Sequence, residues 1–267
     1  MGKWPNLDKI AMIDSPLDDA TYEQKLKKLQ NELLDLQVNH MRTGGQAAIA
    51  VDGWDAAGKG GLIQRLIFGL EPRSVHVWRI RAPTDYEKSR HYLWRFWARL
   101  PERGNWAVFD RTWYGRVLVE RIEGLCSKDE WQRAYREINE FERTLADDGV
   151  HIVKLLVHVS EGEQRQRMIK RLEDPHKRFK VGLEDFRNIA KRKQYLEAYD
   201  DMLEKTHTDH APWHVIASDD KRHARLAGLK IMVEALGRGA TIVPQELDPE
   251  IAKAAGKLWG WAPKAGK

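Results

Sequence analysis

Short apolar runs alternate along the chain with longer stretches of helical spacing. Five runs of four to nine residues are mostly apolar, the pattern of strands that are buried on both faces of a sheet. These runs occupy residues 47–52, 75–80, 106–109, 151–159 and 213–217. Elsewhere apolar residues recur every three or four positions, which predicts amphipathic helices. The predicted helices cover residues 21–43, 60–70, 84–100, 127–146, 183–206 and 219–236, and a further helix begins at residue 160.

Polar pairs mark where several of these helices begin. In a capping box, a hydroxyl residue and a Glu or Gln three positions later bond each other's backbone N–H groups. Pairs with this spacing are Thr21 with Gln24, Thr84 with Glu87, Ser127 with Glu130, and Ser160 with Glu163. We therefore expect helices to start at these four places.

The order of elements predicts the fold class. Strands that alternate with helices of about 10–20 residues indicate βαβ units, in which helices cover both faces of a parallel sheet. A length of 267 residues fits one α/β domain. We expect a single domain over residues 1–267 with a parallel five-stranded sheet. Residues 241–267 contain three prolines and are interpreted as an extension packed on the surface or on a partner.

Composition excludes several classes of protein. The longest uninterrupted apolar stretch, near residues 47–51, is far shorter than the roughly 18 residues of a membrane span. The first fifteen residues lack the apolar segment of a secretory signal. A single cysteine, Cys126, can form neither an internal disulfide nor a Cys-rich zinc site. We therefore expect a cytoplasmic protein with no membrane partner.

The charge is unevenly distributed along the chain. The net charge is only +5, but residues 164–193 carry eleven Lys or Arg against four acidic residues. Residues 73–121 carry eleven against five, whereas residues 14–35 are acidic. Two basic segments favour a polyanionic ligand. The alternative interpretation is a solvated basic face.

A glycine-rich turn between a predicted strand and a predicted helix is the strongest local motif. It has the spacing G-x-x-x-x-G-K, in which backbone N–H groups, a helix N-terminus and a lysine surround a phosphate. Its residues are Gly53, Trp54, Asp55, Ala56, Ala57, Gly58 and Lys59, followed by Gly60. Gly60 replaces the usual Ser or Thr that helps to hold Mg²⁺, so Asp55 is the candidate metal ligand within the loop. The alternative is a structural turn.

An Asp-Arg pair ends the third predicted strand. In a phosphate-loop sheet this strand presents a second acidic residue beside the loop. Asp110 is therefore a candidate magnesium ligand, and Arg111 could stabilise charge on a transferring phosphoryl group. Taken alone, such a pair is more often a structural ion pair.

A basic run follows the fourth predicted strand. It contains Arg165, Arg167, Lys170 and Arg171 and continues, after Pro175, to Lys180. We interpret residues 160–182 as a lid that closes over phosphates and excludes water. The alternative is an exposed basic helix.

Four ordered segments resemble the polyphosphate kinase 2 family. They are VDGWDAAGKGG, FDRTWYGRVLVERIEG, EDPHKRFK and APWHVIASDDKRHARL, and the similarity runs from about residue 29 to residue 236. The resemblance implies a three-layer, thymidylate-kinase-like phosphate-loop fold with a helical lid. It also implies phosphoryl transfer between inorganic polyphosphate and a nucleotide, with Mg²⁺ or Mn²⁺ as the cofactor, by a homo-oligomer, either a dimer or a tetramer.

The resemblance also assigns residues to the site. It implies catalytic roles for Asp55, Lys59, Asp110 and Arg111, with Asp55 and Asp110 holding the metal. The residues implied to contact the substrates are Arg116, Glu120, Arg171, Lys177 and Lys180, together with the loop residues Gly53, Ala56, Ala57, Gly58 and Gly60.

Two further segments resemble the branch of the family that phosphorylates AMP to ADP. They cover residues 91–97 and 137–142. One alternative is the branch that uses ADP or GDP, or that makes polyphosphate in reverse. An alternative from another class is a nucleic-acid-binding module with a structural phosphate loop, although we expect no nucleic acid partner.

Overall fold

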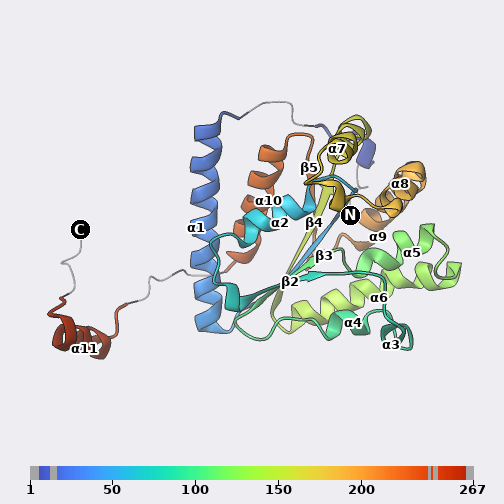
Figure 1. Ribbon diagram of the computed structural model, residues 1–267. Helices are drawn as coiled ribbons and strands as arrows, with labels where there is room; N and C mark the ends of the chain where they lie inside the picture. Colours follow the sequence, from blue (N-terminus) through green and yellow to red (C-terminus); the bar gives the residue numbers. More distant parts are fainter. Residues whose placement is uncertain (1–5, 13–16, 240–241, 243–245, 263–267) are drawn as a thin grey trace.

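Five parallel strands form one sheet in the order β2-β3-β1-β4-β5 (Figure 1). The computed structural model describes residues 6–12, 17–239, 242 and 246–262. The strands are β1 (Gln46–Gly53), β2 (Val75–Arg79), β3 (Trp106–Asp110), β4 (Val150–His158) and β5 (Trp213–Ala217). The five strands and their parallel direction confirm the predicted fold class.

Helices cover both faces of the sheet and complete the three expected layers (Figure 1). One face carries α1 (Asp19–Thr43), α2 (Lys59–Ile67) and α10 (Lys221–Leu236), and the other carries α6 (Lys128–Asp147) and α9 (Arg192–Thr206). The remaining helices are α3 (Asp85–Lys88), α4 (Trp94–Trp97), α5 (Val119–Ile122), α7 (Glu161–Glu173), α8 (Leu183–Ala190) and α11 (Pro249–Trp259). Single 3₁₀ turns, η1 to η4, cover Leu7–Lys9, Pro72–Ser74, Trp113–Arg116 and Arg178–Lys180.

The central strand explains why the sheet is buried on both faces. Ala47, Ala48, Ile49, Ala50 and Val51 of β1 have no exposed surface. Burying such a run removes apolar area from water at about 25 cal/mol per Å². From β1 the chain goes to β2 and β3 on one side and later to β4 and β5 on the other. The carboxyl end of β1 is therefore a topological switch point, where α/β sheets bind ligands.

The predicted helix over residues 84–100 is wrong. The chain there forms two single turns, α3 and α4, although the capping box of Thr84 and Glu87 is present. The buried Glu87 carboxylate lies 2.8 Å from Arg99 Nη2 and 3.6 Å from Arg95 Nε. In one straight helix, Arg95 would lie about 12 Å and Arg99 about 18 Å further along the axis than Glu87. The chain must therefore fold back to share this carboxylate.

Two other helix boundaries differ from the prediction. Helix α1 is capped by Asp18, whose side chain accepts the Thr21 N–H, and not by Thr21 itself. The predicted helix over residues 183–206 is divided at Lys191 into α8 and α9. The division allows α8 to take its own direction.

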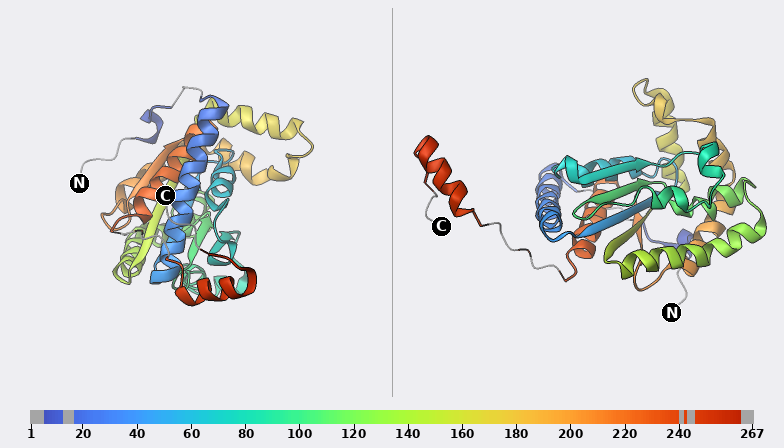
Figure 2. Two further views of the ribbon diagram at one scale, coloured as in Figure 1. Left: turned by 90° about the vertical axis from the view of Figure 1, so that its left-hand side faces the viewer. Right: turned by 90° about the horizontal axis from the view of Figure 1, so that it is seen from below.

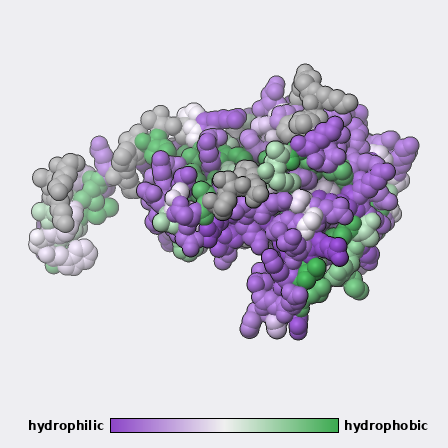
Figure 3. Space-filling view, turned by 90° about the horizontal axis from the view of Figure 1, so that it is seen from above, coloured by the Kyte–Doolittle hydropathy of each residue, from purple (hydrophilic) through white to green (hydrophobic). Residues whose placement is uncertain are grey.

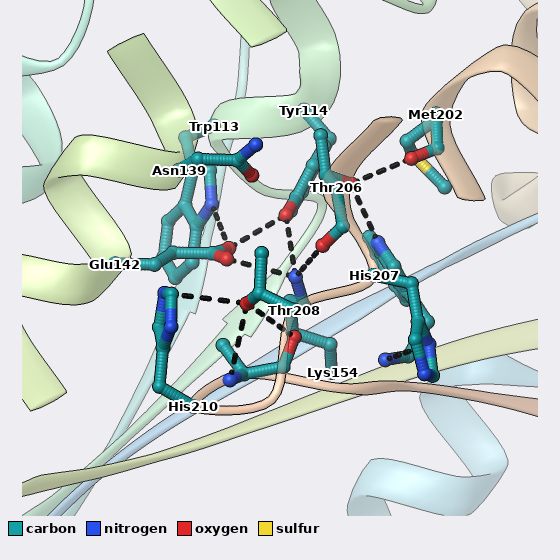
Figure 4. A network of polar contacts seen from close by, with 12 residues as sticks. Trp113, Tyr114, Asn139, Glu142, Lys154, Met202, Thr206, His207, Thr208 and His210 are labelled. Atoms are coloured by element: carbon teal, nitrogen blue, oxygen red, sulfur yellow. Dashed lines mark hydrogen bonds and ion pairs between the residues drawn. The ribbon is translucent and has the colours of Figure 1, made fainter. Parts of the chain in front are cut away.

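A buried ion pair joins strand β4 to helix α6, which covers one face of the sheet (Figure 4). The Lys154 ammonium donates to Glu142 Oε2 at 2.8 Å, to the Tyr114 hydroxyl oxygen at 2.8 Å and to the Thr206 carbonyl oxygen at 2.7 Å. Glu142 Oε1 also accepts from Trp113 Nε1 and from the Tyr114 hydroxyl. Neither side chain of the pair has exposed surface. Because all three protons of the ammonium are used, the network ties η3 to β4, α6 and α9.

A buried histidine makes stability depend on pH. His40 Nδ1 accepts the Trp106 indole N–H at 2.9 Å, and burial, with His151 nearby, lowers its pKa to about 4. Between this value and about 6.5 the unfolded chain binds a proton that the folded chain does not, so stability falls as the pH falls. We expect the free energy of unfolding to decrease by about 3 kcal/mol from this site between pH 7 and pH 4.

Urea unfolding of His40→Gln measures this effect, because glutamine can accept the indole N–H without titrating. The variant should show a shallower loss of stability on acidification, whereas His210→Gln, at an exposed histidine, should follow the wild type. Equal pH slopes for His40→Gln and the wild type would contradict the assignment.

Two parts of the chain stand away from the sheet: the segment from α7 to α8, which includes the predicted lid over residues 160–182, and α11. Figure 2 shows α7, α8 and the turn between them projecting from the body, and Figure 3 shows this lobe as largely hydrophilic. Helix α11 lies apart from the body, with Ile251, Leu258 and Trp259 exposed. Helix α11 therefore does not pack on the body of the chain, and packing on a partner, the other expectation for this extension, stays a prediction. Residues 241, 243–245 and 263–267 lie outside the described part. Among the described helices, none combines the length and apolarity of a membrane span.

Candidate active site

The glycine-rich loop lies where predicted, between β1 and α2. At Gly53, φ is +139° and an added Cβ would lie 2.2 Å from the Val157 carbonyl oxygen, so only glycine fits. Gly58, also with positive φ, precedes α2 and gives it no side-chain cap. The first N–H groups of α2 are thus left for an anion. Lys59 Nζ donates to the carbonyl oxygens of Gly53 at 2.6 Å and Trp54 at 2.9 Å.

Side chains from β4 and α9 hold the loop in place. The Trp54 indole is buried, and its N–H donates to His158 Nδ1 at 2.7 Å. Burial, with Arg192 nearby, lowers the pKa of His158 to about 4, so Nδ1 remains an acceptor at neutral pH. The Arg192 guanidinium lies over the Trp54 ring, 4.0 Å from its centroid.

Arg167 also holds the loop in place, although its position in the basic run predicts a lid cation. The side chain is only 4% exposed. Its guanidinium donates to the carbonyl oxygens of Ala56 at 3.1 Å and Ala57 at 2.8 Å, and to those of Ser218 and Asp219. Arg167 therefore connects the loop to the end of β5.

A cleft opens at the carboxyl ends of β1 and β3 and brings three of the predicted catalytic residues together. The residues that line this cleft include Asp52, Gly53, Trp54, Asp55, Lys59, Arg111, Thr112, Gly115, Gln164, Glu184, Asn188, Tyr195 and Tyr199. Asp55 Oδ1 lies 3.8 Å from Arg111 Nη2, and Arg111 Nη1 lies 2.9 Å from Glu184 Oε1. The cleft thus holds both signs of charge beside the loop lysine.

The backbone at Arg111 is strained. Its φ of +66° lies in the left-handed region, which costs a non-glycine residue of the order of 1 kcal/mol. Parallel pairing of Val51 with Asp110 puts Arg111 opposite Asp52, directly before the loop. Such strain is concentrated at functional sites, because the surrounding structure must enforce it.

Asp52 is a cleft residue that the sequence analysis missed, because it lies inside an apolar strand run. It is 6% exposed, and its Oδ2 accepts a short hydrogen bond from the Thr112 hydroxyl. Burial raises the pKa of Asp52, although Thr112, Lys59 and Arg111 favour the charged carboxylate. The pair links the end of β1 to the segment after β3.

A basic groove lies on the other side of the loop. It is lined by seven cations, and among its described lining residues none is acidic. The groove residues include Ala56, Ala57, Gly58, Arg167, Lys170, Arg171, Lys177, Lys180, Lys221 and Arg225. Burial and the charges of Arg167 and Arg225 lower the pKa of Lys221, although Glu163 opposes this. A polyanion would relieve this mutual repulsion.

Four predicted site residues line neither space: Gly60, Asp110, Arg116 and Glu120. Asp110 ends β3, half-buried beside the cleft. Arg116 Nε pairs with Glu120 Oε2 at 3.1 Å, and its guanidinium lies 4.5 Å from the centroid of the Tyr92 ring. This group adjoins the cleft only through its neighbours Gly115 and Val119.

The surface does not favour the nucleic-acid alternative. Trp106, Trp113 and Trp213 are fully buried, and no aromatic residue is found among the groove-lining residues given above. Single-stranded nucleic acids are bound by aromatic stacking in addition to cations. Trp97 is 45% exposed, but it packs edge-on against Phe141.

Comparisons with known proteins find relatives that are all named as polyphosphate kinases or polyphosphate phosphotransferases. The family model for Polyphosphate kinase 2 (PPK2) matches residues 16–242. The polyphosphate:AMP phosphotransferase of Acinetobacter johnsonii is 43% identical over 88% of this chain and 49% of its own length. The ADP-polyphosphate phosphotransferase of Pseudomonas aeruginosa is 38% identical over 83% of this chain and 74% of its own.

A solved structure covers nearly the whole chain. The crystal structure of polyphosphate kinase 2 from Arthrobacter aurescens matches with a TM-score of 0.84 and 31% identity, over 95% of this chain and 94% of that one. By contrast, the chain spans about half the length, or less, of the polyphosphate:AMP phosphotransferases that it matches.

Proposed function

This chain belongs to the polyphosphate kinase 2 family, and on that premise we propose that it transfers a phosphoryl group from inorganic polyphosphate to AMP. The observation that carries the proposal is the basic groove, which leads to the backbone of the glycine-rich loop. A polyphosphate chain has about one negative charge per phosphate and no bases, so a cationic track without aromatic residues suits it. The loop then separates this donor track from the cleft.

The cleft supplies what phosphoryl transfer requires. The reaction needs donor and acceptor in line and stabilisation of the equatorial oxygens, without a covalent enzyme intermediate. Lys59 would neutralise charge on the transferring group, and Arg111 would exchange its contact with Glu184 for phosphoryl oxygens. Both cations already line the cleft beside the loop, so only their local contacts need to change when the phosphoryl group binds.

We propose that Asp55 and Asp110 hold Mg²⁺ or Mn²⁺ with the substrates. The described residues contain no group of three or more His, Cys, Asp or Glu that could enclose a metal. This fits Mg²⁺, which is usually bound by one or two carboxylates, with water and substrate phosphates as the other ligands. When bound, the ion would neutralise phosphate charge during transfer. Because Gly60 has no hydroxyl group, the two carboxylates are the ligands that the protein would supply to the ion.

AMP is the proposed acceptor because of two segments that meet beside Arg116. His91 Nε2 lies 3.5 Å from Glu137 Oε2, so residues 91–97 contact residues 137–142, the two segments that resemble the AMP branch. Tyr92 lies under the Arg116 guanidinium. The second candidate is ADP, favoured by the ADP-polyphosphate phosphotransferases among the relatives.

A product assay tests the proposal. Purified full chain is supplied with polyphosphate, Mg²⁺ and either AMP or ADP, and nucleotides are separated by chromatography. ADP formed from AMP supports the proposal, whereas ATP formed only from ADP supports the second candidate. If neither nucleotide is phosphorylated, both candidates fail.

The groove predicts a substrate-selective defect. Arg171→Ala, Lys177→Ala and Lys180→Ala together should raise KM for polyphosphate about tenfold, because each exposed ion pair contributes about 0.2–1 kcal/mol. KM for AMP should remain within about twofold. The slope of log KM for polyphosphate against log salt should fall by about 2.

Initial rates at several salt concentrations provide the measurement. The control is Arg136→Ala with Arg143→Ala, which removes two cations of α6 that lie outside the groove. An equal change per cation removed in the control and in the triple variant would mean that only net charge matters.

We also propose a homo-oligomer, a dimer or a tetramer. The exposed apolar face of α11 supports this, since an isolated helix of 11 residues is marginal in water. Light scattering after gel filtration measures the mass. The cytoplasmic location stays a prediction.

A further inference from the structure

Helix α8 sends a side chain into the cleft that no step above uses. Asn188 lies 133 residues after Asp55, and its Nδ2 is 2.7 Å from Asp55 Oδ2. Its Oδ1 is 2.9 Å from the hydroxyl oxygen of Tyr195, on α9. Asn188 and Tyr195 both line the cleft. These contacts form a chain from Tyr195 through Asn188 to the carboxylate.

The direction of each hydrogen bond follows from the chemistry of the groups. An ionised carboxylate only accepts, so the NH₂ group of Asn188 must face Asp55. The carbonyl oxygen of Asn188 then faces Tyr195, whose hydroxyl must donate. Burial, with nearby Glu123, raises the pKa of Tyr195, which keeps this proton on the phenol. Only one arrangement of the amide satisfies both neighbours.

Tyr195 itself is held by packing. It is 6% exposed, and its ring lies against those of Trp54, at 6.4 Å between centroids, and Tyr199, at 6.3 Å. Trp54 belongs to the glycine-rich loop, so the support for Asn188 is built on the same loop as Asp55. The separation of α8 from α9 at Lys191 places the two side chains in reach.

The contacts on Asp55 come from different sides. Gln164 Nε2 donates to its backbone carbonyl oxygen at 2.9 Å, Asn188 occupies Oδ2, and Oδ1 lies 3.8 Å from Arg111. With Oδ2 occupied, the carboxylate has one orientation, and Oδ1 faces the side of the cleft that holds Arg111. Without Asn188, rotation about the Cβ–Cγ bond would be restricted only by the long contact to Arg111.

We propose that Asn188, oriented by Tyr195, is a positioning residue that fixes the Asp55 carboxylate for phosphoryl transfer. This inference rests on the proposed function. Residues that orient a metal-binding or catalytic side chain typically contribute about 10–100-fold to metal affinity or activity. Asn188 acts through Asp55 and contacts no reacting atom itself, so its contribution should vanish when Asp55 cannot respond.

A double-mutant cycle tests this dependence. The four proteins are the wild type, Asn188→Ala, Asp55→Asn and the double variant, each assayed with labelled AMP over times long enough to detect slow turnover. Asn188→Ala should lower kcat about 10–100-fold with KM for AMP within about threefold. In the Asp55→Asn background the same change should alter kcat less than about twofold. Tyr195→Phe, which removes only the orienting hydroxyl, should give a smaller loss than Asn188→Ala.

A second readout does not need turnover. Binding of Mn²⁺ to the substrate-free protein, followed by the paramagnetic resonance signal of the free ion, should weaken about tenfold in Asn188→Ala. The melting temperature should stay near that of Asn39→Ala, the matched change of a half-buried helical asparagine in α1.

The outcomes separate this inference from the proposed function. If the wild type transfers no phosphoryl group, the proposed function fails. If the wild type is active and Asn188→Ala matches it in both kcat and Mn²⁺ binding, only the inference is overturned. Equal losses from Asn188→Ala in both backgrounds would also overturn it, because they would indicate that Asn188 merely anchors α8.

Discussion

Arg111→Ala should transfer phosphoryl groups about 10³-fold more slowly than the wild type, the lower end of the effect of a catalytic arginine. The guanidinium lies in the cleft between Asp55 and Glu184, on a backbone held in the left-handed region. No other arginine lies among the described residues that line the cleft. KM for polyphosphate should change less than about threefold, because Arg111 does not line the basic groove. Single-turnover rates with saturating substrates measure the loss.

Two further variants make this prediction specific. Arg111→Lys keeps the charge but loses the planar pair of donors, so it should recover only part of the rate. Arg143→Ala removes an exposed arginine that pairs with Asp147 on α6 and should remain within twofold of the wild type. An Arg111→Ala rate within tenfold of the wild type would exclude Arg111 from the reaction.

Lys154→Met should be the most destabilising of the substitutions considered. It leaves the Glu142 carboxylate buried without its counter-charge, which typically costs about 3–5 kcal/mol. For a chain of this size each kcal/mol lowers the melting temperature by about 2–4 °C, so we expect a fall of about 10 °C. Burial already works against the charge on Lys154 and lowers its pKa. Calorimetry and urea unfolding provide the measurement.

The partner substitution shows whether the unpaired charge is the cause. Lys154→Met with Glu142→Gln removes both charges and keeps an acceptor for Trp113 and Tyr114, so it should regain at least about 1 kcal/mol. Lys205→Met removes an exposed lysine paired with Asp201 and should cost less than about 1 kcal/mol. The prediction fails if Lys154→Met costs no more than this control.

Local sequence was sufficient for the sheet and for the centre of the site. Strands buried on both faces of a sheet appear in the sequence as continuous apolar runs, which need no information from distant segments. The spacing from Gly53 to Lys59, between such a run and a helical pattern, likewise predicts the loop. Arg111 could be found because it directly follows a buried strand. The parallel register of β1 and β3 then places Arg111 opposite Asp52, at the carboxyl ends of the two strands.

The missed residues depend on contacts between distant segments. Asn188 and Glu184 reach the cleft only because α8 turns away from α9 at Lys191, and no local pattern indicates that turn. Arg167 has the same spacing as exposed lid cations, and only its burial against the loop carbonyls distinguishes it. The prediction of one helix over residues 84–100 was wrong for the same reason. Glu87 pairs with Arg95 and Arg99, which follow the helical turn that contains it, and no local pattern indicates these contacts.

The glycine-rich loop has one face toward the basic groove and the other toward the cleft. Polyphosphate in the groove and the nucleotide in the cleft can therefore bind independently. We expect the two substrates to add in random order, and neither has to leave before the other can enter. A bisubstrate compound, with a short phosphate chain joined to adenosine, would span the loop. Its affinity would benefit from both half-sites at once, as in any tethered pair of ligands.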